Sequence, residues 1–144
     1  MAQVMRVNGW HAEVEVKVTK LLRRRFDKDH GDVDLLAWRD DGRVLAIECK
    51  DVQFRKTLGE MAEQLSDFRG EIHSNGRRDE LRKHLDRMEV IRQHLPLVAA
   101  YVGRPSVDAV ESHLLFRNPV PTEFELIRMA GQVQVSNFGA IGLI

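Results

Sequence analysis

The chain has a single cysteine, no excess of either charge and no long apolar run. Cys49 alone cannot form an internal disulfide, which fits a reducing cytoplasm. The 22 basic and 22 acidic residues cancel, which argues against a histone-like positive coat but not against a local basic groove. No apolar stretch approaches the ~20 residues that a membrane helix needs, and no charged-then-apolar leader opens the sequence. We therefore expect a soluble, cytoplasmic protein that does not enter the membrane.

Several motifs of catalysis and metal binding are also missing. The sequence has no glycine-rich phosphate loop, no serine or cysteine nucleophile motif and no zinc-knuckle spacing. Its 6 histidines are scattered without the spacing of metal ligands, and His30 is best interpreted as a solvated loop residue. With 144 residues the chain is long enough for one domain with a hydrophobic core, but not for two.

Local patterns in the first third predict three consecutive antiparallel strands. Residues 10–20 alternate valine with charged residues, which favours a strand, with a helix as the alternative. We expect this strand to pair with residues 32–39 across a basic loop. A hairpin turn at 40–43, with glycine where positive φ is needed, then leads into a strand that ends at Lys50.

The next segment predicts helices. Thr57 and Glu60 have the spacing of a capping box, which indicates a helix ending near Gly70. An apolar stripe predicts a second helix from about 79 to 94, which Pro96 would stop.

Strands are predicted again towards the end of the chain. The unbroken apolar run at 97–102 is typical of a strand covered on both faces. Further strands are predicted at 111–117 and around Val133 and Val135. The predicted fold class is therefore α/β (α+β), with a mixed central β-sheet flanked by helices.

The strand that ends at Lys50 carries the most informative pattern. Its alternation places Glu48 and Lys50 on one side and Ile47 and Cys49 on the other. Charge on such a strand costs several kcal/mol unless a partner or a metal compensates. Carboxylates beside a lysine are what a divalent-metal phosphodiesterase needs, because acids hold the cation and lysine orients water or balances charge. A buried Glu48–Lys50 salt bridge without catalysis is the simpler alternative.

A family resemblance strengthens the catalytic interpretation. Gly31-Asp32-Val33-Asp34-Leu35-Leu36-Ala37 followed by Ile47-Glu48-Cys49-Lys50 resembles the PD-(D/E)XK nuclease superfamily, with its restriction-endonuclease-like fold. Within it the chain is most similar to the Mrr-type and Holliday-junction-resolvase-like branches, over about residues 10–103. The pattern of a glutamate and a lysine separated by one residue, as in Glu48-Cys49-Lys50, occurs a second time at Glu15-Val16-Lys17. This second copy has no aspartate-bearing strand before it and is interpreted as a surface segment.

The resemblance implies roles for individual residues. Asp34 and Glu48 would bind Mg²⁺ or Mn²⁺, Lys50 would assist the attacking water, and Gln64 would lie near the phosphate. The implied activity is metal-dependent cleavage of DNA by one nuclease domain spanning 1–144. Asp32 is better interpreted as capping the turn after Gly31 than as a second ligand.

One family feature is missing. The family usually opens with a helix that donates a further glutamate, and a strand at 10–20 leaves only residues 2–8, which contain no acid. A helix at 10–20 would instead offer Glu15. The chain is thus compatible with a piece of a longer protein, and with a rival function: a catalytically inactive nuclease-fold module that binds nucleic acid or a partner protein.

Basic residues near the predicted site are candidates for phosphate contact, because arginine forks suit phosphate oxygens. They are Arg23, Arg24 and Arg25 in the loop before the second strand, and Arg55 and Lys56 just after Lys50. A solubilising role for the arginine loop is an equal alternative. The sequence does not fix the oligomeric state, and a homodimer is compatible with it.

Overall fold

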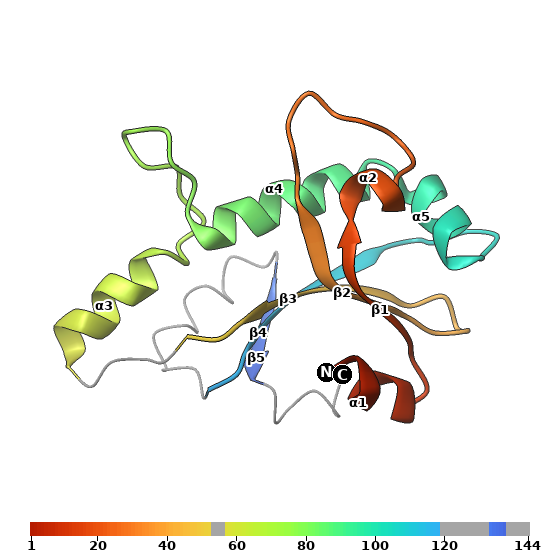
Figure 1. Ribbon diagram of the computed structural model, residues 1–144, viewed down its shortest axis with the longest axis horizontal. Coiled ribbons are helices and arrows are strands. Elements are labelled where there is room, and N and C mark those ends of the chain that lie inside the picture. The colour runs from red at the N-terminus through yellow and green to blue at the C-terminus, as the bar shows by residue number, and fades with distance from the viewer. Residues whose placement is uncertain (53–56, 119–132, 138–144) are drawn as a thin grey trace.

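The structure, a computed structural model, describes residues 1–52, 57–118 and 133–137. In this part of the chain a mixed five-stranded sheet has the order β1-β2-β3-β4-β5, with helices flanking it (Figure 1). The strands are β1 (His11–Lys17), β2 (Asp32–Trp38), β3 (Val44–Lys50), β4 (Val110–Phe116) and β5 (Gln134–Asn137). The helices are α1 (Ala2–Val7), α2 (Val18–Leu21), α3 (Leu58–Ser66), α4 (Glu80–Arg92) and α5 (Leu95–Val102). The predicted α+β architecture is confirmed.

The first three strands form the predicted antiparallel meander. Val14 is paired with Leu35 between β1 and β2, and Leu35 is paired with Ile47 between β2 and β3. The tight turn between β2 and β3 places Gly42 at φ 91°, a conformation that glycine adopts without steric cost. The helix alternative for residues 10–20 is wrong, although the last part of that segment turns into the short helix α2.

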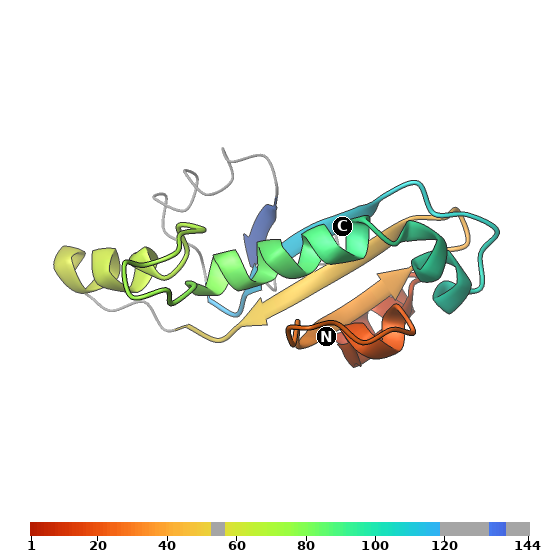
Figure 2. The ribbon, with the colours of Figure 1, turned by 90° about the horizontal axis from the view of Figure 1, so that it is seen from above.

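The remaining two strands, β4 and β5, join the sheet through parallel pairings. β3 pairs with β4 in parallel, and β4 pairs in parallel with β5, so the predicted strands near 111–117 and at Val135 are confirmed. The connection from β3 to β4 contains α3, α4 and α5, and α4 runs along the sheet in the view from above (Figure 2). The predicted helix at 79–94 is thus confirmed as α4, whose N-cap Asp79 accepts a hydrogen bond from the Arg82 amide at 2.7 Å.

Each face of the sheet packs against different helices. On one face Val44 and Ala46 of β3 belong to a core that includes Met88 and Ile91 of α4. On the other face Leu45 and Ile47 pack with Met5 of α1, among others. Because side chains alternate along a strand, the even-numbered residues of β3 face α4. Glu48 and Lys50 continue that even-numbered series.

The prediction of a strand at 97–102 is wrong, because these residues lie in α5. Pro96 occupies the first turn of this helix, where a missing N–H costs nothing, so it begins a helix as well as ending one. Gly103 follows at φ 70° as the left-handed C-terminal cap. Val98, Ala99 and Val102 are buried, a spacing that puts them on one helical face.

The capping box before α3 forms in a modified way. The Thr57 hydroxyl accepts a hydrogen bond from the Glu60 amide at 3.3 Å and donates to the Glu60 carboxylate at 2.8 Å. The acid therefore meets the threonine hydroxyl, and the predicted helix start is confirmed. Across the described ranges, no helix has the length and apolar character needed to cross a membrane.

Candidate active site

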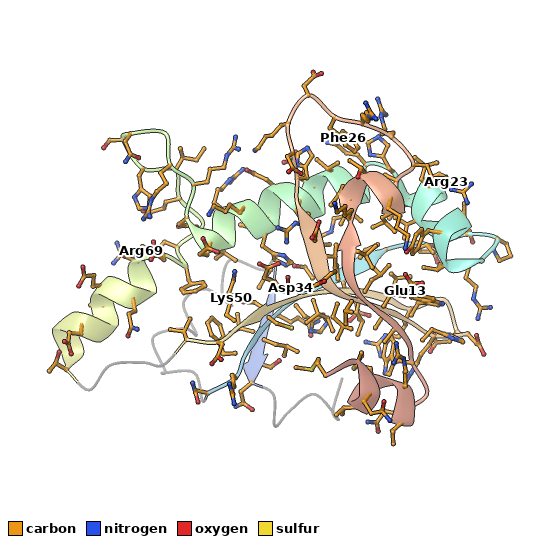
Figure 3. The ribbon with its side chains drawn as sticks, viewed as in Figure 1. Glu13, Arg23, Phe26, Asp34, Lys50 and Arg69 are labelled. Carbon is orange, nitrogen blue, oxygen red and sulfur yellow. The ribbon has the colours of Figure 1, made fainter. Side chains whose placement is uncertain are left out.

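The two predicted metal-binding carboxylates lie on neighbouring strands. Leu35 is paired with Ile47 and Leu36 with Ala46, so extending this register by one step sets Asp34 of β2 opposite Glu48 of β3. The Asp34 Oδ2 atom accepts a hydrogen bond from the backbone N–H of Cys49 at 2.8 Å, which fixes the aspartate against β3. Asp34 and Lys50 both lie between the sheet and α4 (Figure 3).

Glu48 is almost fully buried and is held by two cations. Its residue exposure is 7%, its Oε1 atom lies 2.9 Å from Lys50 Nζ, and its Oε2 atom accepts from Arg87 NH1 at 2.5 Å. Burial pushes the pKa of Glu48 upwards, but the charges of Arg87 and Lys50 outweigh burial and lower the pKa below its ordinary value. Glu48 is therefore ionised at neutral pH.

Lys50 is held in its charged form by two acids. Besides Glu48, its Nζ atom lies 2.8 Å from Oε2 of Glu80 on α4. Burial lowers the pKa of Lys50, but the two carboxylates more than offset burial and raise the pKa above its usual value. Hydrogen bonds from Lys50 and Lys83 lower the pKa of Glu80 to about 2. Lys50 is thus an ammonium group that donates hydrogen bonds, and it is not a proton acceptor.

Asp34 is in a less favourable environment for its charge. Burial raises the pKa of Asp34, the Cys49 amide lowers it, and the nearby charge of Glu48 raises it again, with a net increase. Two like charges with reduced hydration, side by side on one face, are the arrangement that a divalent cation relieves.

The donor set fits a hard cation that keeps part of its water shell. Mg²⁺ is commonly bound through one or two carboxylates together with water and substrate phosphates, and Asp34 and Glu48 supply such a pair. A closed structural zinc site needs more ligands, and no group of three or more His, Cys, Asp or Glu side chains placed to hold a metal ion occurs among the residues that the structure describes. The Glu48–Lys50 salt bridge of the simpler alternative is present in the same site.

Helix α4 contributes side chains that the sequence interpretation missed. His84 is 2% exposed, its Nε2 atom lies 2.7 Å from Ser112 Oγ on β4, and its Nδ1 atom lies 3.8 Å from Glu48 Oε2. Burial lowers the pKa of His84 to about 4, so the ring is neutral at pH 7. Arg87 also donates from Nε to the His30 carbonyl at 2.8 Å, which joins α4 to the loop before β2.

Helical spacing contains a signal for these residues. His84 lies on the same stripe as the buried Leu81, Met88 and Ile91, so it occupies a core position of the helix. Glu80 and Arg87 lie two turns apart and therefore share a second stripe. This second stripe meets β3, where Glu80 pairs with Lys50 and Arg87 donates to Glu48.

Other predicted residues take no part in the contacts of Glu48 and Lys50 described above, or lie outside the described ranges. Gln64 belongs to α3, which projects beyond the end of β3 and away from the sheet (Figures 1 and 2), so its phosphate role stays a prediction. Arg55 and Lys56 lie outside the described residues. Asp32 begins β2, and Glu15 is an exposed residue of β1 with φ 51°.

The arginine loop is exposed. Arg23, Arg24 and Arg25 all face solvent, and Arg24 NH1 lies 2.9 Å from His94 Nε2 while its guanidinium sits 5.4 Å from the centroid of the Phe26 ring. Helix α1 has the sequence AQVMRV, without an acid, as expected from the strand interpretation of residues 10–20.

Comparison with known families assigns the chain. The model of a family described as anti-phage protein Upx-like matches residues 1–139. The chain belongs to the Upx-like family. The description of this family as anti-phage indicates a defence-related role. Comparisons with curated proteins and with solved structures gave no match.

Proposed function

We propose that this Upx-like protein is a metal-dependent nuclease that hydrolyses phosphodiester bonds in DNA during anti-phage defence, with an active site of the PD-(D/E)XK type. The observation that carries the proposal is the juxtaposition of Asp34 and Glu48 on adjacent strands, with the Lys50 ammonium on the same face. Burying these charges is costly, and a purely structural sheet has no need of them.

Each residue has a role that follows from its protonation state. Asp34 and Glu48 hold Mg²⁺ or Mn²⁺, which when bound supplies Lewis acidity towards the scissile phosphate and the attacking water. Lys50 donates a hydrogen bond and its positive charge to the negative charge that develops on the phosphate. Because Lys50 stays protonated, it orients water and does not remove a proton from it.

A second candidate function is a nuclease-fold module that binds nucleic acid or a partner protein without cutting. Two observations favour it: α1 carries no acid, and Arg87 and Lys50 already neutralise Glu48. In this case the acids and bases of the site would serve only to join α4 to the sheet.

Cleavage of labelled DNA with Mg²⁺, Mn²⁺ or EDTA separates the two candidates. We expect cleavage with either metal, and a loss of roughly a thousandfold or more in Asp34→Ala and Lys50→Ala. Lys20→Ala is the matched control, because Lys20 is an exposed, ion-paired lysine of α2. Circular dichroism verifies that each variant is folded. A wild type that binds DNA but cuts no faster than Lys50→Ala would establish the binding module instead.

A further inference from the structure

A charged hollow lies between α4 and the loop that precedes β2. Its volume is about 220 Å³, enough for a phosphate group with ordered water. Four cationic side chains line it, together with two carboxylates. The cations are Lys28, Arg78, Lys83 and Arg87, and the carboxylates are Asp29 and Asp86. In Figure 1 the loop rises beside α4, and in Figure 2 the two again lie next to each other.

The carboxylates of the hollow are engaged within the protein. Asp86, with 15% of its side chain exposed, lies within ion-pair distance of three cations: Arg82 at 2.8 Å, Arg78 at 2.9 Å and Lys28 at 3.6 Å. Asp29 accepts a hydrogen bond from the Gly31 amide at 2.8 Å. One carboxylate surrounded by three cations leaves a local excess of positive charge, and this excess attracts an anion.

The hollow adjoins the candidate active site through two connections. Arg87 lines the hollow and also donates to Glu48. Lys83 lines the hollow and pairs at 2.8 Å with Glu80, which in turn pairs with Lys50. The hollow is thus connected to Glu48 through Arg87, and to Lys50 through Lys83 and Glu80.

We propose that this hollow binds a backbone phosphate of the DNA strand, one that neighbours the phosphate to be cut. The proposal rests on the nuclease function proposed above, and it adds Lys28, Arg78 and Lys83 as substrate-positioning residues. A phosphate matches the site because lysine supplies point charge and arginine supplies a planar fork to its oxygens. Such contacts fix the register of the strand without reading its sequence.

The test measures binding of fluorescent duplex DNA by anisotropy in EDTA, over a range of salt concentrations, with the double variant Lys28→Gln/Arg78→Gln. We expect binding to weaken roughly tenfold, and the slope of log affinity against log salt to decrease in magnitude by about 1. The matched control is Lys20→Gln/Arg104→Gln, which removes one lysine and one arginine from ion pairs with Glu13 and Asp40. The control should change affinity less than about twofold.

The outcomes separate this proposal from the nuclease proposal. If the wild type cuts DNA while both double variants bind alike, the phosphate site is wrong and the nuclease stands. If the wild type does not cut but only Lys28→Gln/Arg78→Gln loses affinity, the nuclease is wrong and the phosphate site stands. A wild type that does not bind DNA overturns the phosphate site. Thermal unfolding of both variants verifies that lost affinity is not lost fold.

Neutral backbone substitutions locate the phosphate. In a series of duplexes, each has one backbone phosphate replaced by an uncharged methylphosphonate. At one position the replacement should weaken DNA binding by the wild type and leave DNA binding by Lys28→Gln/Arg78→Gln unchanged. This non-additivity is expected only if the hollow and that phosphate are in contact. Equal losses in both proteins at every position would refute the contact.

Discussion

Arg87 joins a buried acid of the sheet to a loop on the protein surface. Its NH1 atom donates to Glu48 Oε2 at 2.5 Å, and its Nε atom donates to the His30 carbonyl at 2.8 Å. The side chains of Arg87 and Glu48 are only 12% and 9% exposed. One guanidinium therefore holds three segments together: α4, β3 and the loop before β2.

Removing this guanidinium should destabilise the fold. In Arg87→Ala, Glu48 stays buried with only Lys50 as its strong partner, and breaking one side of a buried pair costs about 3 kcal/mol. Urea unfolding monitored by circular dichroism measures the loss. The control is a double-mutant cycle with Glu48→Gln, in which the two losses should be less than additive. Strict additivity would show that the two side chains do not interact.

His84 should make stability depend on pH. Because burial lowers its pKa from 6.5 to about 4, the unfolded chain binds a proton between these values and the folded protein does not. The unfolding free energy therefore falls as pH decreases from 6.5 to 4, by about 3 kcal/mol from this residue. Unfolding of metal-free wild type and His84→Gln, compared at each pH, isolates the contribution. Parallel curves for the two proteins would contradict the buried neutral histidine.

Gly31 offers a way to disturb the site without changing a charged residue. It has φ 68°, and a Cβ atom there would lie 3.4 Å from Arg87 NH2, whereas Gly42 has φ 91° and open space around it. Gly31→Ala and Gly42→Ala should each lose roughly 1 kcal/mol because of the left-handed backbone. Only Gly31→Ala should also slow DNA cleavage, by moving Arg87. Equal rates of DNA cleavage by the two variants would contradict an effect of Gly31→Ala on Arg87.

Metal binding should be detectable without DNA. A ligand that binds only the folded state stabilises it, by about 2.7 kcal/mol at a hundredfold excess over its dissociation constant. We therefore expect Mn²⁺ to raise the melting temperature of the wild type by roughly 5 °C or more, and not that of Asp34→Asn. Asp108→Asn, which changes an exposed acid, should respond like the wild type. Identical shifts in all three proteins would place the metal elsewhere.

The sequence predicts this molecule best where local patterns dominate. The antiparallel strands and the capped helix α4 follow from alternation, turn glycine and N-cap residues that act over a few positions. The run at 97–102 misleads, because a short apolar segment reads equally as a strand or a buried helix, and Pro96 marks both a helix end and a helix start.

The candidate site likewise contains residues that local sequence patterns predict and residues that they do not. Asp34, Glu48 and Lys50 are close in sequence and are joined by one hairpin, so their shared face can be read from period-two alternation. His84 and Arg87 reach the same acid from a helix that follows much later in the chain. Helical spacing shows which residues of α4 share a face, but no local pattern shows which side chains of β3 that face meets.

The parallel pairing of β3 with β4 also sets an order of assembly. The hairpin that carries the two carboxylates closes through a short turn, whereas α4 is fixed over the sheet by a crossover that spans everything between β3 and β4. Closing so long a connection is slow compared with forming a hairpin. A folding chain therefore brings Asp34, Glu48 and Lys50 together before Arg87 of α4 arrives. The docking of α4 is the step at which Glu48 gains Arg87 as its second cation.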